Sequence, residues 1–397
     1  MKILVIHNLH RSGSASGDDG VYSREAALLE KMGHKVIRYT LSNDEFDRKG
    51  SLGKTSVAFQ IPWSMTSART ILDIVRKERP GVAHVHNFFP LLSPSIYYTL
   101  KAEGVRVVQT LHDFRFMCAN AFFMRDGLIC EDCKGGPSLR SVKYGCFKGS
   151  RLQTIPVAAM IKLHSMRGTF RRKIDTYICL TDFQRDIFGG AGFERAKLVV
   201  KPNFVEDRTS GVAKAGEYAI FVGRLGEEKG VRTLIEAWKN LPEIPLKIVG
   251  DGPDAAAFRA LASARNAENV EFLGYLSNTE CMKILSSARF LVMPSIWHET
   301  FGLTAVEAFS CGKPVIASNL GGMADIVDDG RTGFLFAPGD PADLAQKVSE
   351  LWNDPRGCEA MGRAARQEYE EKYTPERNHE MLMSIYSAVI AGSKGNS

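Results

Sequence analysis

The regular alternation of short apolar runs with amphipathic stretches restricts the fold of this chain more than any other feature. Apolar runs rich in β-branched residues occupy positions 2–8, 34–40, 82–87, 105–113, 176–181 and 198–203, and again 218–225, 246–252, 270–276, 288–295 and 313–319. Strands that alternate with helices form parallel sheets through right-handed connections. The runs at 288–295 and 313–319 are almost wholly apolar, as expected for strands buried on both faces. We therefore predict an α/β chain of doubly wound sheets.

A polar stretch near the middle of the chain divides these runs into two groups. The length of 397 residues suits about two domains. Residues 201–218 are polar and contain Pro202, Gly211 and Gly216, so we place a domain boundary near residue 207. We predict one Rossmann-like domain at 1–207, a second at 208–374, and a helix at 375–391 that begins with Pro375 and crosses back to the N-terminal domain. The tail 392–397 is expected to be disordered.

The composition, 44% hydrophobic and 24% charged, is that of an ordinary globular protein. The first residues are interrupted by His7 and Asn8 and do not fit a signal peptide. No run approaches the roughly 18 apolar residues of a membrane-spanning helix. We expect a cytoplasmic protein.

Charge is distributed unevenly along the chain. Up to Val205 there are 31 Lys and Arg against 18 Asp and Glu, a net charge of +13, whereas the remainder has 20 against 27, a net charge of −7. The segment Lys134–Ile174 contains ten basic residues and no acidic one. Such a block indicates an anionic surface or substrate, and the alternative is a solvated helix face.

Two glycine-containing turns follow strand-like runs in the second half, at the strand ends where parallel sheets bind ligands. In the first turn, 223–230, Gly223 allows a tight turn, and Arg224 and Lys229 lie beside a predicted helix N-terminus. Two cations and free backbone amides suit a diphosphate, although a surface turn with solvated charges has the same pattern. The second turn, 250–253, includes Gly252, which permits close approach to a ligand but is equally typical of an ordinary turn.

A pair of glutamates, Glu299 and Glu307, flanks the predicted start of a helix near Gly302. The free amides at Gly302, Leu303 and Thr304 would point toward phosphate or sugar oxygens. Carboxylates accept hydrogen bonds from hydroxyl groups well, so the two glutamates suit two polyols such as a ribose and a hexose. The alternative is a capping role for Glu299 and a solvated Glu307, but the apolar surroundings of Glu307 make an unpaired carboxylate costly.

Together these residues resemble the Glu-x7-Glu pattern of retaining glycosyltransferases of family 4 with the GT-B fold. The resemblance covers essentially the whole chain. Its further elements are the turn Ser12–Gly20, Gly33-His34, His112-Asp113, Asn203, the GRL-EKG turn, GDGP, HETFGL, Gly321-Gly322 and the closing helix. It implies two Rossmann-like domains facing each other across a cleft. The region Ser12–Tyr22 departs from the family pattern by extra Ser and Asp residues, which leaves the acceptor side uncertain.

The resemblance also implies roles for individual residues. Arg224 and Lys229 would bind the donor diphosphate, with Gly223 and Gly252 in the flanking turns. Glu307 would bind the nucleotide ribose. Glu299, together with the amides of Phe301, Gly302 and Leu303, would bind the donor sugar and the distal phosphate. His112 would lie against the donor sugar near the reacting carbon, so His112 and Glu299 are the catalytic candidates.

The implied reaction moves a hexose or N-acetylhexosamine from a UDP- or GDP-sugar to a glycan or lipid-linked glycan, with retention of configuration, in polysaccharide or cell-envelope biosynthesis. The leaving diphosphate oxygen would assist deprotonation of the acceptor, so no separate base is required. No Asp-x-Asp follows a strand-like run in a place to bind a divalent ion. We expect no catalytic cofactor or metal and no nucleic-acid partner.

Other classes of protein remain as alternatives. A sugar-nucleotide 2-epimerase or a phosphorylase-like enzyme would share the architecture, but the GRL-EKG and Glu-x7-Glu patterns together favour a transferase. A non-catalytic nucleotide-sugar sensor would also retain the fold. A Rossmann dehydrogenase is disfavoured because no GxGxxG precedes a ribose-binding acid at the proper distance.

Four of the eight cysteines, Cys118, Cys130, Cys133 and Cys146, are bunched within a predicted excursion at 113–150. One C-x2-C pair and two single cysteines suit a closed, structural zinc site. Reduced thiols, disulfides and an iron–sulfur cluster are the alternatives.

The stretch directly after Cys146, to about residue 175, is apolar on one helical face and basic on the other. Such a helix lies well at the surface of a membrane with anionic lipids. The sequence therefore suggests peripheral docking on the inner membrane leaflet, and the alternative is an ordinary packed helix with a basic rim.

Overall fold

The computed structural model describes residues 1–12, 17–135, 139–207 and 216–392. The chain forms two compact units. The first comprises residues 1–125, 130–201 and the chain from His379 onward, and the second comprises 126–129 and 202–378. The units thus divide between Lys201 and Pro202, a few residues before the position expected from the sequence. Part of the predicted turn after the first strand (13–16), most of the predicted linker (208–215) and most of the predicted tail (393–397) lie outside the described residues.

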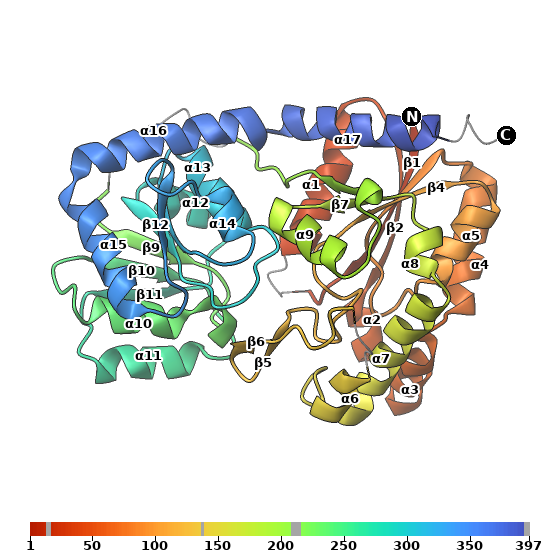
Figure 1. Ribbon diagram of the computed structural model, residues 1–397, viewed down its shortest axis with the longest axis horizontal. Helices are drawn as coiled ribbons and strands as arrows, with labels where there is room; N and C mark the ends of the chain where they lie inside the picture. The colour runs from red at the N-terminus through yellow and green to blue at the C-terminus, as the bar shows by residue number, and fades with distance from the viewer. Residues whose placement is uncertain (13–16, 136–138, 208–215, 393–397) are drawn as a thin grey trace. The chain divides into compact units, whose positions relative to one another are not determined.

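The first unit is built on a parallel six-stranded sheet with the order β2-β1-β3-β4-β7-β8 (Figure 1). The strands are β1 (Lys2–Leu9), β2 (Lys35–Ser42), β3 (Val82–Asn87), β4 (Arg106–Thr110), β7 (Thr176–Cys179) and β8 (Leu198–Val200). The helices between them include α1 (Gly17–Lys31), α2 (Asn43–Arg48), α3 (Ser51–Gln60), α4 (Met65–Glu78), α5 (Ser95–Ala102) and α9 (Asp182–Gly190), and the 3-10 turn η1 (Arg195–Lys197) precedes β8.

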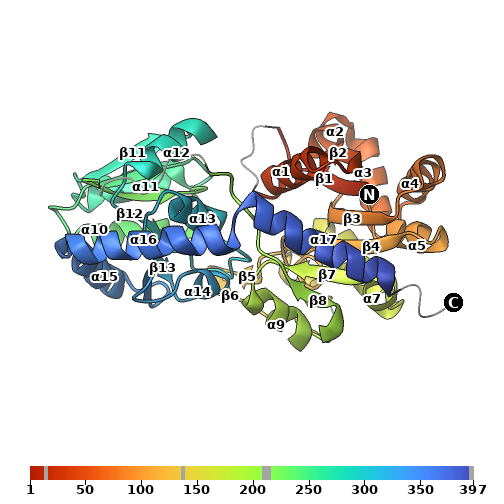
Figure 2. The ribbon, with the colours of Figure 1, turned by 90° about the horizontal axis from the view of Figure 1, so that it is seen from above.

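Alternate residues of the central strands supply two cores, one on each face of this sheet. Leu4 and Ile6 of β1 pack in a cluster with Ile71 of α4 and Ile96 of α5. On the other face, Ile3 and Val5 pack with α1 and with α17 (Pro375–Ala391), which supplies Leu382 and Tyr386 (Figure 2). The buried Tyr386 hydroxyl lies 2.7 Å from Nδ1 of His84 in β3. The helix α17 thereby completes the core of the first unit.

A long segment between β4 and β7 contains the cysteines and the basic residues. It has two strands of two residues each, β5 (Met124–Arg125) and β6 (Leu128–Ile129), followed by α6 (Arg140–Tyr144), α7 (Arg151–Met166) and α8 (Thr169–Arg172). Regular structure is thus sparse until α7 begins.

The second unit has a parallel sheet of the same kind, with the order β11-β10-β9-β12-β13-β14. The strands are β9 (Ala219–Val222), β10 (Leu246–Val249), β11 (Val270–Gly274), β12 (Phe290–Met293), β13 (Val315–Ser318) and β14 (Gly333–Phe336). The helical elements are η2 (Glu227–Lys229), α10 (Val231–Trp238), α11 (Ala255–Ala264), α12 (Asn278–Ser286), α13 (Leu303–Ser310), α14 (Met323–Ile326), α15 (Pro341–Asn353) and α16 (Pro355–Lys372). All four residues of β12 and of β13 are buried, as their apolar sequences predict.

The predicted fold class, two Rossmann-like doubly wound units of parallel strands and helices, is confirmed. None of the helices in the described residues is both long and apolar enough to span a bilayer.

Candidate active site

The candidate residues for binding the donor nucleotide lie in the second unit, at the point where the order of the strands in its sheet reverses. The chain runs from β9 outward through β10 to β11 and then returns to the opposite side of β9 as β12. Such a switch point leaves a crevice at the carboxyl ends of the strands, where open α/β sheets bind ligands. Residues 223–230 follow β9, residues 250–253 follow β10, and residues 294–302 follow β12. The three predicted motifs are therefore brought to one edge of one sheet.

Glycines allow these three loops to touch through their backbones. A Cβ on Gly250 would stand 1.9 Å from the carbonyl oxygen of Gly223. A Cβ on Gly230 would stand 1.7 Å from the carbonyl oxygen of Pro294. Both glycines have positive φ, 135° and 69°, so any side chain would be excluded by space and by backbone conformation. The predicted Gly252 is similarly close, with its Cβ position 2.4 Å from the carbonyl oxygen of Leu225.

Lys229 and Glu299, which are seventy residues apart in the sequence, form an ion pair with Nζ 2.7 Å from Oε1. The same carboxylate oxygen accepts a hydrogen bond of 2.8 Å from the hydroxyl of Ser295. The Glu299 side chain is only 8% exposed. Lys229 Nζ also stands 5.2 Å from the ring centroid of Trp297, within range of a cation–π contact. A buried carboxylate is stable here because a cation and a hydroxyl group surround it.

Arg224 is half-exposed and forms an ion pair with Glu228. The Glu228 carbonyl oxygen accepts a 3.0 Å hydrogen bond from the amide of Ile296, so this residue connects the loops after β9 and β12. Glu228 was not among the residues predicted from the sequence. Its position between Arg224 and Lys229 in the sequence GRLGEEKG is the signal by which it could have been identified.

The helix α13 begins at Leu303, with Gly302 as its N-cap residue and no side-chain cap. The helix thus starts where the sequence predicts, and no side chain caps its first amides. Phe301 is buried and packs edge-on against Tyr373, so its ring belongs to the core and only its backbone can serve a ligand. Glu307 is half-buried in the second turn. Burial, and then the nearby Glu307 carboxylate, raise the pKa of the Cys281 thiol to about 12.

His112 lies in the first unit, just beyond the end of β4, and is buried. Its Nε2 is 3.0 Å from Nδ1 of His86 in β3, and the two rings are stacked. Burial, and then the neighbouring histidines, hold the pKa of His112 well below its ordinary value. Burial also lowers the pKa of His86 to about 3. Both rings are therefore neutral at physiological pH.

Behind His86 is a buried ionic cluster that the sequence analysis missed. Glu25 Oε1 lies 3.2 Å from His86 Nε2 and 3.2 Å from His84 Nδ1, while Glu25 Oε2 lies 3.0 Å from Lys201 Nζ. Burial opposes ionisation of Glu25, but Lys201 and the two histidines hold its pKa well below the usual range. The members come from α1, β3 and the residue after β8, so only the His-x-His repeat in 82–87 was visible in the sequence.

The same cluster is the one group of three or more His, Cys, Asp or Glu residues in the described chain whose ligand atoms lie within 4.8 Å of one another. The Lys201 ammonium already donates a hydrogen bond to Oε2, the other carboxylate oxygen of Glu25. A divalent cation beside that ammonium would be repelled, so we assign no metal to Glu25, His84 and His86.

Two aspartates at the start of α1 were noted in the sequence only as extra acids, and one of them, Asp18, lies near His112. The Nδ1 atom of His112 lies 3.8 Å from Oδ1 of Asp18. Asp19 accepts hydrogen bonds from His7 Nε2 at 2.7 Å and from the backbone amide of His10 at 3.0 Å. Burial, and then the nearby carboxylate of Asp113, raise the pKa of Asp18 to about 7.

The four clustered cysteines line one small cavity in the first unit. Cys118 is buried and Cys130, Cys133 and Cys146 are half-buried, and all four are free thiols. Burial, and then the other three thiols, raise the pKa of Cys133 to about 11. The structure therefore brings the four predicted ligands to one place.

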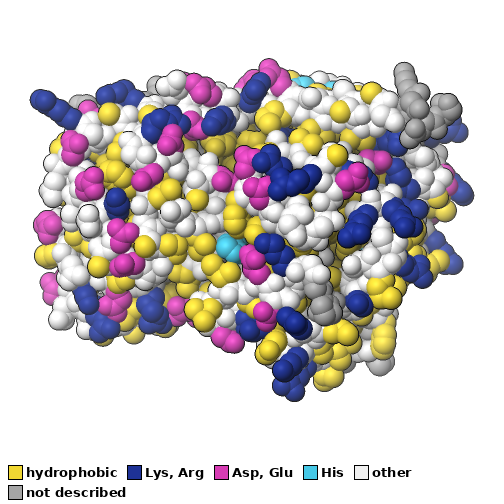
Figure 3. Space-filling model, viewed as in Figure 1, with side chains coloured by type: hydrophobic (Ala, Val, Ile, Leu, Met, Phe, Trp, Pro, Cys, Tyr) yellow, Lys and Arg dark blue, Asp and Glu magenta, His cyan; other side chains and the backbone are white. Residues whose placement is uncertain are grey.

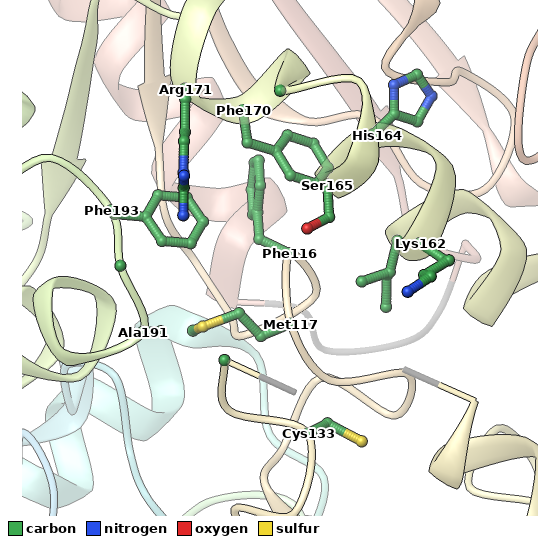
Figure 4. A pocket seen from close by; sticks show the side chains of 14 residues that line it. Phe116, Met117, Cys133, Lys162, His164, Ser165, Phe170, Arg171, Ala191 and Phe193 are labelled. Carbon is green, nitrogen blue, oxygen red and sulfur yellow. The ribbon is translucent and has the colours of Figure 1, made fainter. Parts of the chain in front are cut away.

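A larger cavity of about 320 Å³ lies beside α7 and α8. Figure 4 shows its wall of Phe116, Phe170 and Phe193, with Cys133 at its lower edge. His164, which also lines it, lies 2.8 Å from the carbonyl oxygen of Pro62 and 2.9 Å from the Thr169 hydroxyl. Both ring nitrogens are therefore engaged in packing the unit, and we assign this cavity no role in the reaction.

Two family models match successive parts of the chain. Residues 23–208 match the model described as Glycosyltransferase Family 4, and residues 204–368 match the model described as Glycosyl transferases group 1. Together they account for most of the sequence.

Curated relatives are similar mainly over part of their length. The sulfoquinovosyl transferase SQD2 of Arabidopsis thaliana is 37% identical over 174 residues, which is 43% of this chain and 33% of the relative. The 2-deoxystreptamine glucosyltransferase of Streptomyces kanamyceticus is 34% identical over 62% of this chain and 63% of its own. The chain thus aligns with a third to somewhat under two thirds of these two proteins.

A solved structure shares the whole fold. Anabaena Alr3699/HepE in complex with UDP superimposes with a TM-score of 0.69 at 19% identity, covering 98% of this chain and 100% of the other. The same protein has also been solved with UDP-glucose. The similarity confirms the fold that the sequence predicts. With its two parallel-sheet units and its matches to both family models, the chain belongs to the group 1 glycosyltransferases of the GT-B fold, with a family 4 region in its first half.

Proposed function

We propose that this glycosyltransferase is a retaining enzyme that moves a hexose or N-acetylhexosamine from a UDP- or GDP-sugar to a glycan or lipid-linked glycan. The observation that carries the proposal is the Lys229–Glu299 ion pair at the switch point of the second sheet, beside the uncapped start of α13. The UDP and UDP-glucose bound to the Anabaena protein, and the glucosyltransferase among the relatives, support a nucleotide-sugar donor.

When the donor binds, Arg224 and Lys229 exchange their carboxylate partners for the phosphate groups of the donor. In the structure the side chains of Arg224 and Lys229 pair with the carboxylates of Glu228 and Glu299. A diphosphate brings two negative groups that Arg224, Lys229 and the first amides of α13 bind together. Glu299 is then released to accept hydrogen bonds from the hydroxyl groups of the sugar, and Glu307 binds the ribose.

The transfer step requires position and charge more than a separate base. The bond from the anomeric carbon to the phosphate oxygen breaks, and the acceptor oxygen bonds to the same face of that carbon. The acceptor proton passes to the leaving phosphate oxygen. Arg224 and Lys229 stabilise the negative charge that develops on the diphosphate, which is the task a metal ion performs elsewhere. His112, just beyond the end of β4, is the residue that we expect to lie against the donor sugar.

The first unit has a surface suited to a lipid-linked acceptor. Exposed apolar side chains stand on α3, α7 and the residue before α6, namely Phe59, Leu139, Leu152 and Ile155. Basic residues of the segment 134–174 lie among them, and Figure 3 shows hydrophobic and basic side chains side by side in this part of the surface. Apolar groups amid Lys and Arg suit the interface of an anionic membrane. We place the enzyme in the cytoplasm, peripherally on the inner leaflet.

The function is tested by the donor and by the product. UDP-, GDP- and ADP-sugars are screened for a rise in melting temperature, because a ligand that binds only the folded state stabilises it. The stabilising donor is then incubated with glycan acceptors, and the anomeric configuration of the product is read by NMR. We expect transfer with the configuration of the donor. A product of inverted configuration, or no donor binding at all, would contradict the proposal.

The ion pair at the switch point is tested by Lys229→Ala and Glu299→Gln. Each change removes a group that we expect to act on the diphosphate or the sugar, so kcat/KM for the donor should fall by about 10²–10³, as for loss of one group stabilising a transition state. Arg232→Ala is the matched control, because Arg232 forms an exposed ion pair with Glu227 in the same turn. Equal losses in the control and the two variants would show a general effect of the turn.

Metal independence is tested by brief treatment with EDTA followed by magnesium or manganese. We expect the initial rate to stay within twofold, since Arg224 and Lys229 supply the positive charge at the diphosphate. A rate that collapses in chelator and returns with either ion would refute this part of the proposal.

Membrane docking is tested by flotation with vesicles of phosphatidylglycerol and phosphatidylcholine at low salt. We expect binding that weakens as salt rises, and a loss of at least fivefold in bound protein for the double variant Phe59→Ser, Leu152→Ser. Tyr275→Ser, which removes an exposed aromatic residue of the second unit, is the control. Absence of binding to anionic vesicles argues for an ordinary solvated surface.

A further inference from the structure

Three separate stretches of the first unit bring their cysteines to one cavity. Cys118 follows β4, Cys130 and Cys133 follow β6, and Cys146 follows α6. The cavity has a volume of about 20 Å³, which is room for one occupant of the size of a water molecule or an ion.

Two guanidinium groups stand at the same cavity. They belong to Arg140 and to Arg125, which also forms a 2.9 Å ion pair with Asp132. The Cys118 thiol donates a 2.8 Å hydrogen bond to Oδ1 of Asn120. Four thiolates around a divalent ion carry a net charge of −2, and nearby guanidinium groups reduce that charge. Such outer groups orient and stabilise metal ligands.

Packing alone gives no reason for this arrangement. The other four cysteines, Cys179, Cys281, Cys311 and Cys358, are all buried within the two units, as is usual for a free cysteine that packs as a small apolar residue. Three of the clustered cysteines are instead half-exposed. They stand in a segment that, within its described residues, contains the short elements β5, β6 and α6 before α7 begins and is otherwise formed by turns.

We propose that Cys118, Cys130, Cys133 and Cys146 bind one Zn²⁺ in a closed, structural site. The four thiols release their protons to solvent on binding, and no position is left for a substrate. Among the described residues no three of these sulfurs lie within 4.8 Å of one another, so the ion would draw the three stretches closer than they stand here. Zinc binding would hold the segment that follows His112 in one conformation.

The metal content of the protein tests this site independently of any transferase activity. Full-length protein is purified without chelator, and zinc is measured by mass spectrometry and by its release to a colorimetric chelator on treatment with a mercurial. We expect about one zinc per chain, and less than a tenth of that in the double variant Cys130→Ser, Cys133→Ser. Cys281→Ser, a buried cysteine of the second unit, is the control and should keep its zinc.

A second measurement serves if the double variant does not fold. Cobalt replaces zinc in the wild-type protein, and the absorption spectrum is recorded. We expect a thiolate-to-cobalt charge-transfer band and the intense visible bands of tetrahedral cobalt. The proposal is overturned by wild-type protein that holds neither zinc nor cobalt after reconstitution, by stoichiometric iron, by disulfides among these four cysteines, or by a double variant that keeps its metal.

Discussion

The carboxylate of Glu299 is nearly excluded from water, and its pairing with Lys229 determines much of the second unit's chemistry. Two loops that follow different strands are tied by this contact, and the absence of a side chain at Gly230 allows their backbones to meet. An ion pair at this depth is weak evidence for stability, because desolvation offsets most of the attraction. Under the proposed function, the lysine would bind a phosphate group of the donor, and the carboxylate would accept hydrogen bonds from hydroxyl groups of its sugar.

The first unit also contains a buried ion pair, formed by Glu25 and Lys201. The two side chains are almost fully buried, and His84 and His86 lie 3.2 Å from the Glu25 carboxylate. Nδ1 of His86 is in turn hydrogen-bonded to Nε2 of His112. Each unit thus contains an acid–lysine pair shielded from water, and the two pairs are built on unrelated sequence patterns.

The sequence was sufficient to predict the strands and turns, because neighbouring residues encode them. Apolar runs predicted nearly all the long strands, and the glycine turns identified the strand ends where Arg224, Lys229 and Glu299 lie. It could not show which groups would pair, because the partners of Lys229 and Glu25 are brought near only by the folded sheets. The Glu25 cluster combines three distant elements and leaves just a His-x-His repeat in the sequence. Phe301 was grouped with the ligand-binding amides, and only the structure shows its ring turned into the core against Tyr373.

The position of α17 has a consequence for the order of folding during synthesis. The first unit holds residues 1–125 and 130–201, yet its core against β1 and β3 is unfinished without Leu382 and Tyr386. While the ribosome translates the second unit, Ile3, Val5 and the charged cluster behind His86 lack the part of their cover that α17 provides. Domains usually fold in the order of their synthesis. Here the unit that is made second can be complete first, and the nascent first unit has one face of its sheet covered by α1 but not by α17 until residue 386 has emerged.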